Sequence, residues 1–165
     1  MSAGLACGAP SGAPVGVSER PWRGASAAPA VDAGAADAAA ALPADYRARF
    51  AKVNKARFVS SGHAAGRWEL DVYANELAER ALAARARDVP IGAVVVAEHF
   101  ERGSDAGVGP IMVMEKRRPG FSPDHGDWRF VVVGASGRLV KEGAIESCAG
   151  CHDDAPMDGM FPILE

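Results

Sequence analysis

Residues 148–152 read Cys-Ala-Gly-Cys-His, and this pentad constrains the fold more than any other feature of the 165-residue chain. Two thiols three residues apart, followed at once by an imidazole, form the attachment signature of c-type haem. Cys148 and Cys151 can each add across a haem vinyl group, and the turn between them leaves His152 beneath the macrocycle to bind iron through a ring nitrogen. The pentad therefore predicts one covalently attached haem c, with His152 as an iron ligand.

Two other kinds of site use a Cys-x-x-Cys pair and stay open as lesser alternatives. A thioredoxin-like redox pair normally opens a helix after a strand within a βαβ unit, whereas this pair lies near the C-terminus. A zinc site needs further ligands, but the one remaining cysteine, Cys7, lies in a low-complexity tail. The other histidines, at positions 63, 99 and 125, are isolated from one another in the sequence. The haem interpretation is therefore favoured.

The composition sets the scale of the molecule and argues against one class of partner. With 48% hydrophobic and 24% charged residues, the chain is long enough for one domain with a proper core. Its net charge is -3 and it has no block of Lys and Arg, which argues against nucleic acid as a partner. It also has no run of about 18 apolar residues that could span a bilayer. The sequence predicts a protein that is soluble or tethered.

The chain divides near residue 43. Residues 1–43 are rich in Ala, Gly and Pro and carry almost no large hydrophobic side chains, which is typical of a low-complexity tail or tether. Residues 44–165 then form the expected mono-haem domain. The boundary is placed where the Ala-rich composition gives way to alternating apolar and charged residues.

Haem c attachment implies export, because c-type cytochromes are completed on the outer side of the bacterial cytoplasmic membrane. The residues before Cys7 lack both the basic and the apolar region of a secretory signal. Residues 4–7, Gly-Leu-Ala-Cys, resemble the end of a lipoprotein signal, in which small residues precede a lipidated cysteine. We therefore expect a periplasmic protein, or one tethered to the outer membrane through Cys7, with a truncated export signal. An unmodified Cys7 in a small-residue tail is the alternative.

The remaining sequence predicts a sheet with few helices. Residues 44–55 have helical spacing of apolar side chains, and Asn75 is placed to cap a second helix that runs to about Arg87. Four β-rich runs are expected at 68–73, 93–100, 110–115 and 128–133. This pattern predicts an α+β domain and excludes the all-helical cytochromes.

From about Phe50 to Phe161 the chain resembles the cytochrome P-460 family, which includes the β-sheet type of cytochrome c-prime. The pentad is specific by itself, and the other blocks contribute through their order and spacing. These blocks are Ser-Ser-Gly-His (60–63) with Arg67, Val-Tyr-Ala-Asn (72–75), Pro-Ile-Gly-Ala-Val-Val-Val (90–96), Gly-Pro (109–110), Val-Met-Glu-Lys-Arg (113–117), Pro-Gly-Phe (119–121) and His-Gly-Asp-Trp (125–128).

The resemblance implies a single haem c on a mainly antiparallel sheet with one or two helices packed on it. It also implies His152 as the proximal ligand, an open or weakly filled distal side, and a homodimer. Iron with an open position binds small molecules such as nitric oxide. We expect an exported cytochrome that binds nitric oxide or a similar small ligand, or transfers electrons to an unidentified redox partner. The alternative is an oxidoreductase that acts on hydroxylamine or a related small nitrogen compound.

One position departs from the family in a way that bears on the enzyme alternative. In the cross-linked members, a lysine directly after the strand equivalent to residues 93–96 bonds covalently to the haem edge. This chain has Ala97 there, which has no nucleophilic nitrogen, so the cross-link and the hydroxylamine chemistry that accompanies it are not expected. Lys116 is a conceivable substitute, although the cross-linked relatives carry this lysine as well.

The strand that contains Ala97 brings further candidates toward the iron. Residues alternate faces on a strand, so Val95, Ala97 and His99 are expected to share one face. His99 is then a candidate distal base or ligand, although a half-exposed histidine at a strand end is the favoured interpretation. An enzyme acting on hydroxylamine would need a proton acceptor such as Glu98 or His99.

Other candidate residues are expected to have structural roles. His63 lies in an expected loop, where it would donate a hydrogen bond or order the loop, and His125 is expected to hold a turn. Met157 and Met160 follow His152 too closely for the chain to reach the opposite face of the haem, so neither is predicted as a sixth ligand. Core positions are predicted for Met112, Met114, Phe58, Phe100 and Phe130, with the alternative that one or two of the three phenylalanines cap the distal face of the haem and restrict it to small diatomic ligands.

Overall fold

The fold is that of a computed structural model, which describes residues 41–103 and 108–163. These residues form a seven-stranded antiparallel sheet with short helices on its faces, so the predicted α+β class is confirmed. The order is β1-β3-β4-β5-β6-β7, and β2 also pairs with β3. The strands are β1 (Ala51–Lys52), β2 (Phe58–Val59), β3 (Trp68–Ala74), β4 (Val94–Glu101), β5 (Val108–Lys116), β6 (Trp128–Val133) and β7 (Leu139–Gly143).

The four predicted β-rich runs correspond to β3, β4, β5 and β6, whereas the long predicted N-terminal helix is wrong. Helix α2 covers only Tyr46–Arg49, and Phe50 is already extended, with φ -101° and ψ 149°. The chain then pairs with β3 through the register Ala51 to Ala74 and Lys52 to Tyr73. Pairing with a sheet edge therefore replaces the later turns of the predicted helix, which a periodicity argument cannot anticipate.

Helix α3 (Glu76–Ala84) starts where the sequence predicts. The Asn75 side chain accepts a hydrogen bond from the Ala78 backbone N–H at 3.0 Å, and it also accepts one from the Val94 N–H at 3.0 Å. The cap therefore ties α3 to the start of β4. The helix ends at Arg85, which is left-handed with φ 49°, slightly before the predicted end near Arg87.

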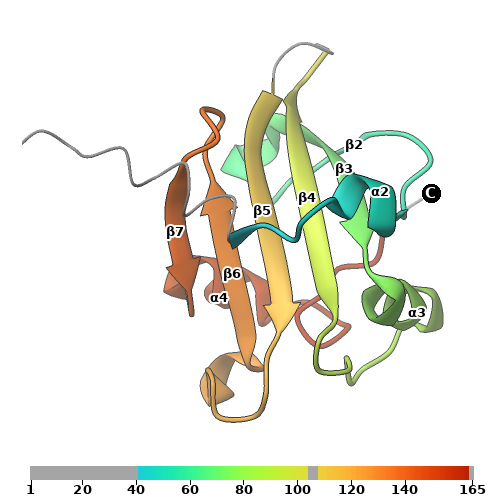
Figure 1. Ribbon diagram of the computed structural model, residues 1–165, viewed down its shortest axis with the longest axis vertical. Coiled ribbons are helices and arrows are strands. Elements are labelled where there is room, and N and C mark those ends of the chain that lie inside the picture. The colour runs from blue at the N-terminus through green and yellow to red at the C-terminus, as the bar shows by residue number, and fades with distance from the viewer. Residues whose placement is uncertain (1–40, 104–107, 164–165) are drawn as a thin grey trace, which may run out of the picture. The chain divides into compact units, whose positions relative to one another are not determined.

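Strand alternation divides the central sheet into two faces. Along the register, Val72 of β3 pairs with Ala97 of β4, Ala97 with Met112 of β5, and Met112 with Val132 of β6, so these residues share a face. Figure 1 shows helix α4 (Glu146–His152) and the C-terminal segment behind the sheet in that view, with α2 in front. The two short 3-10 helices are Ala64–Gly66 and Pro123–His125.

Each face has its own hydrophobic cluster. The α4 side holds the larger one, which includes Ala74, Ala78, Trp128, Phe130, Ile145, Ala149, Met157 and Met160. The α2 side holds Ala41, Tyr46, Val96, Val113, Val131 and Val133.

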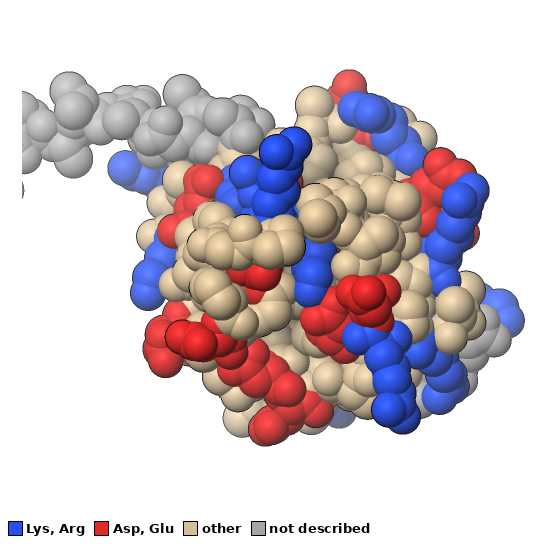
Figure 2. Space-filling view, turned by 90° about the horizontal axis from the view of Figure 1, so that it is seen from below, with Lys and Arg blue, Asp and Glu red and all other residues tan. Residues whose placement is uncertain are grey.

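Figure 2 shows basic, acidic and uncharged side chains together on one surface of the molecule. None of the helices in the described part of the chain is long and apolar enough to cross a membrane. Residues 1–40 of the predicted tail, Cys7 among them, lie outside the described residues, whereas Ala41 is buried in the α2-side cluster, so the folded part begins slightly before the predicted boundary at residue 43.

Candidate haem-binding cavity

Helix α4 presents the pentad to a cavity. Cys148, Cys151 and His152 stand at positions i, i+3 and i+4 of the helix, which puts them on neighbouring parts of its surface. All three line a cavity of about 670 Å³. Cys148 is half-buried and Cys151 is exposed, and both are free thiols. Burial raises the pKa of the Cys148 thiol, which favours its neutral form.

The cavity walls are mainly apolar. They are built from the α4 face of the sheet, the chain from β2 to the first 3-10 helix, α4, and the C-terminal segment. Among the described residues, no Asp, Glu, Lys or Arg lines this cavity. Its volume falls within the roughly 300–1,000 Å³ typical of cofactor sites. Wall residues include Phe58, Leu70, Val72, Val95, Ala97, Met112, Met114, Phe130, Val132, Met160 and Phe161.

The His152 ring is oriented by a backbone carbonyl. Its Nδ1 lies 2.7 Å from the Gly159 carbonyl oxygen, and because a carbonyl only accepts, Nδ1 carries the proton and donates. Nε2 is then the lone-pair nitrogen. Burial lowers the pKa of His152, which favours the neutral ring that a metal requires. The rings of Phe130 and Phe161 lie 5.5 and 5.6 Å from it.

That carbonyl belongs to a tight turn between Met157 and Met160. Each of these two residues donates its N–H to the carbonyl of the other, at 3.3 and 3.0 Å. Asp158 and Gly159 both have positive φ, 50° and 86°, as a type I′ turn requires. Met157 and Met160 are therefore held in the turn. Met160 lines the cavity, and no observation makes either residue a sixth ligand.

Three groups anchor the turn through Asp158. Its Oδ2 accepts a hydrogen bond from the Val89 N–H at 2.8 Å and pairs with Lys116 Nζ at 2.6 Å. Its carbonyl oxygen accepts a bond from Trp128 Nε1 at 2.7 Å. The ends of β5 and β6 thereby fix the carbonyl that orients His152.

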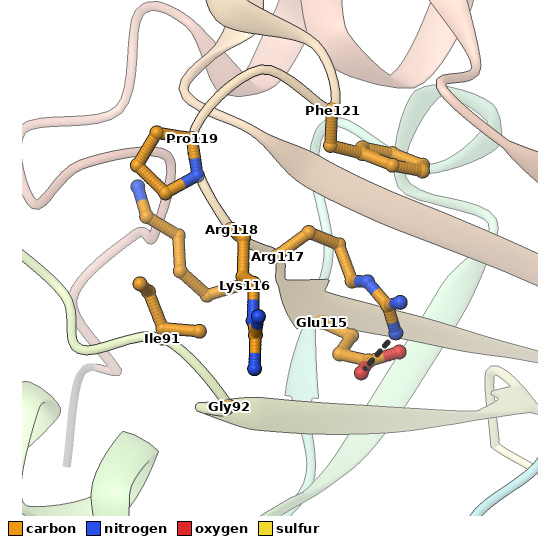
Figure 3. Close-up of a pocket in the computed structure, with 8 residues that line it drawn as sticks. All are labelled: Ile91, Gly92, Glu115, Lys116, Arg117, Arg118, Pro119 and Phe121. Atoms are coloured by element: carbon orange, nitrogen blue, oxygen red, sulfur yellow. Dashed lines mark hydrogen bonds and ion pairs between the residues drawn. The ribbon is translucent and has the colours of Figure 1, made fainter.

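Lys116 faces this turn rather than the cavity. Besides Asp158, its Nζ donates to the Gly126 carbonyl at 2.7 Å. Lys116 lines a separate surface pocket of about 430 Å³, shown in Figure 3, in which Arg117 turns to pair with Glu115 at 2.7 Å. Nothing in its position supports Lys116 as a substitute for the missing cross-linking lysine.

His63 faces His152 across the cavity. Both residues line the cavity, and their ring centroids lie 6.5 Å apart with planes tilted by 35°. His63 comes from the chain between β2 and the first 3-10 helix, where its Nδ1 lies 2.8 Å from Nε2 of His99. Burial and the nearby His152 both lower the pKa of His63. The sequence anticipated a hydrogen bond from His63 but not its position opposite the pentad.

The favoured expectation for His99 is wrong, because the side chain is completely buried, with 0% exposure. Its Nδ1 lies 2.8 Å from the Pro110 carbonyl oxygen. Burial lowers the pKa of His99 to about 4, with a further contribution from the neighbouring His63. His99 lies on the expected face with Ala97, but it is not a cavity wall residue; it stands behind His63.

The other proposed proton acceptor, Glu98, lies on the opposite face of the sheet. It accepts hydrogen bonds from the Tyr46 hydroxyl and from Arg47 Nε, the latter at 2.5 Å. Burial and this carboxylate raise the pKa of Tyr46 above its ordinary value. No carboxylate therefore reaches the cavity from β4, and this arrangement gives no support to the hydroxylamine alternative.

The remaining candidates divide between wall, core and surface. Ala97 and Met112 line the cavity, Met112 being half-buried rather than in the closed core. His125 does not simply hold its own turn, because its Nδ1 lies 2.7 Å from Asp153 Oδ2, next to the pentad. The hydrogen bond raises the pKa of His125. Core positions are confirmed for Phe100 and Phe130, whereas Phe58 and Met114 line the cavity half-buried.

No sequence pattern indicates the contact between His63 and His99, because this contact joins a loop to a strand 36 residues away. A zinc site receives no support, since within 41–103 and 108–163 no three His, Cys, Asp or Glu side chains gather to hold a metal. Cys7 lies outside these ranges.

In comparisons with known proteins, no protein-family model matches the chain, and no curated protein matches it.

Proposed function

We propose that this protein is a mono-haem c-type cytochrome of the cytochrome P-460 type. Cys148 and Cys151 would hold haem c, and His152 would bind its iron through Nε2. One observation carries the proposal: all three side chains line one mainly apolar cavity of about 670 Å³, with the His152 ring already oriented by Gly159. The arrangement suits a large planar apolar group with a metal at its centre.

The attachment needs no group beyond the two thiols. Each S–H would add across one vinyl group: the sulfur would bond to one carbon, the hydrogen would end on the other, and no atom would leave. Cys148 is half-buried and Cys151 exposed, so the thiols lie at the border between cavity and solvent. When bound, haem supplies one-electron redox chemistry and an iron that binds small ligands.

The chain itself orients His152, lines the cavity mainly with apolar side chains and leaves one edge accessible. Phe161 is 49% exposed and lines the cavity, so the cavity reaches the surface there. We propose electron exchange with a partner protein, or binding of a small diatomic ligand such as nitric oxide, as the use of this site. Export to the periplasm, with tethering through Cys7, and a homodimer are part of the same proposal.

The test is covalent haem in the full chain. The chain is fused to a periplasmic export signal and produced with the cytochrome c maturation machinery. Mass spectrometry after denaturation is expected to show one haem per chain. The double variant Cys148→Ala with Cys151→Ala is expected to lose it, and the matched variant His125→Ala, which changes a histidine outside the cavity, to keep it. A denatured wild-type chain without bound haem would overturn the proposal.

A further inference from the structure

The separation of His63 and His152 matches that of two ligands on one metal ion. A bond of about 2 Å from each imidazole nitrogen to a shared ion, on opposite sides, places the two ring centroids roughly 6 Å apart. The observed separation is 6.5 Å. His63 belongs to the chain after β2 and His152 to α4, so the pair spans the cavity between two elements that are distant in sequence.

Hydrogen bonds fix the proton on each ring at the nitrogen remote from the cavity. The Pro110 carbonyl can only accept, so His99 donates from Nδ1, and the neutral ring of this fully buried residue accepts at Nε2. His63 must then donate from Nδ1 to His99, which leaves its Nε2 with a lone pair. His152 reaches the same state through Gly159.

Both lone-pair nitrogens are open to the cavity. In the described part of the chain, no buried side-chain nitrogen or oxygen lacks a hydrogen-bond partner. Within residues 41–103 and 108–163, neither Nε2 has a hydrogen-bond partner, so neither atom can be fully buried. Since both residues line the cavity, the accessible nitrogens of His63 and His152 face the same space.

The sheet is irregular at the point that supports His63. The β4–β5 register shifts between Glu98 and Phe100, which leaves Gly109 and Pro110 opposite His99. Such a bulge frees a carbonyl from the ladder and re-aims side chains. A Cβ on Gly109 would lie 2.7 Å from the Trp68 ring, so glycine lets this ring pack against His99. The His99 position is therefore built into the sheet.

We propose that His63 is the second axial ligand of the haem iron and that His99 positions it. This inference rests on the proposed haem site, and it replaces the open distal side that the family resemblance implies. His63 would donate its Nε2 lone pair to iron without losing a proton, because the proton stays on Nδ1 toward His99. The site would then be six-coordinate and low-spin, suited to electron transfer, and an external ligand would bind only when His63 leaves.

The methionines of the cavity are the competing ligands. Met112, Met114 and Met160 all line it, and a thioether is the common alternative to a second imidazole. None of them has a partner that fixes its direction as His99 fixes His63. Spectroscopy separates the two cases, because histidine–methionine ligation gives a sulfur-to-iron charge-transfer band that bis-histidine ligation lacks.

The experiment uses the full chain with haem attached, and covalent haem is quantified first for every variant. Absorption and electron paramagnetic resonance spectra of the ferric wild type are expected to be low-spin and to lack the sulfur band. His63→Gly is expected to become high-spin with its haem retained, and added imidazole is expected to restore the low-spin spectrum. His125→Ala is the matched control and should stay low-spin.

Carbon monoxide binding to the ferrous protein gives a second readout. In the wild type, the rate should level off with rising carbon monoxide, because His63 must leave first. In His63→Gly, binding should be faster by about tenfold or more, since no internal ligand competes. His99→Leu removes the acceptor for His63 and should give a mixture of spin states, whereas His99→Gln can still accept and should restore the low-spin fraction.

The outcomes separate the two proposals. Absence of covalent haem overturns the proposed function. A wild type with haem attached but a high-spin spectrum, or with the sulfur band, overturns the role of His63 and leaves the proposed function standing. A low-spin spectrum that survives in His63→Gly without imidazole also overturns that role. Low-spin wild type, high-spin His63→Gly and imidazole rescue together support it.

Discussion

Lys116 Nζ lies 2.6 Å from Asp158 Oδ2, and this ion pair joins the last residue of β5 to the turn that orients His152. The two side chains are only 12% and 18% exposed. Asp158 also accepts the Val89 N–H, so the carboxylate connects three segments of the chain. Lys116, the conceivable substitute for the cross-linking lysine, is therefore engaged in an ion pair with Asp158.

Lys116→Met should destabilise the protein by about 1–3 kcal/mol, because it leaves a mostly buried carboxylate without its cation. Chemical denaturation of the full chain measures the change. Arg80→Met is the control, because it breaks an ion pair with Glu76 in which both side chains are more than 70% exposed. This substitution should lower the free energy of unfolding by less than about 0.5 kcal/mol. With haem attached, the absorption spectrum of Lys116→Met should keep the wild-type form. A lost band would show that this lysine bonds to the haem.

Gly159→Ala should destabilise the protein by about 2–4 kcal/mol. Its φ of 86° is strained for alanine, and the new Cβ would lie 2.5 Å from Trp128 Nε1. Gly137→Ala is the matched control, because Gly137 has φ 76° with nothing within 4 Å, and should cost about 1 kcal/mol. Thermal and denaturant unfolding compare the two. Equal losses would mean that the Trp128 contact is not limiting.

The protein should lose stability in acid partly through Asp71. Burial raises the pKa of this carboxyl, but bonds from Lys52, Asn54 and Arg57 outweigh it and lower the pKa below its ordinary value. A carboxylate with a lowered folded pKa contributes stability above the unfolded value, near about 4, and loses it as the pH falls through the folded value. Denaturant unfolding of Asp71→Asn from pH 7 downward should show lower stability at neutral pH and a smaller loss in acid.

The exposed Glu76→Gln serves as the control for that series and should keep the wild-type acid profile. If Asp71→Asn lost stability in acid as steeply as the wild type, other carboxylates would carry the pH dependence.

Ala97→Phe should reduce the covalent haem yield severalfold without unfolding the apo-protein. Ala97 is a wall residue on the sheet, so a phenyl ring there would occupy part of the space that haem needs. Val140→Phe, on the 66% exposed Val140 of β7, is the control and should leave the yield unchanged. Haem per chain is measured by absorption and mass spectrometry. An unchanged yield in Ala97→Phe would place haem elsewhere.

The sequence predicted the central sheet because its strands carry dense β-branched runs, such as the three valines at 94–96 in β4. It missed β1, β2 and β7. The first two have two residues each and are defined only by pairing with β3. In β7, the run Leu-Val-Lys-Glu-Gly is mostly polar, so its assignment depends on pairing with β6. Short edge strands have no periodicity to detect.

For the site, local sequence could indicate the pentad but not the groups that complete it. Cys148, Cys151 and His152 lie within one helix, so their spacing carries the information. Gly159 could be recognised as a turn residue, yet its contact with His152 depends on how the turn folds back. The contact of His63 with His99 depends on the sheet register and its bulge, which no local pattern encodes.

The cavity on the α4 side also bears on how the protein matures. It interrupts the packing between the sheet and α4, so the chain folds around a gap of about 670 Å³ whose walls are mainly apolar. Wetting or collapse of such a gap is unfavourable, and filling it adds the contacts that a closed core would have. Haem attachment would therefore complete the hydrophobic core, and the chain before attachment would be the form most open to proteolysis. Resistance to proteases would then be a measure of whether the proposed haem is attached.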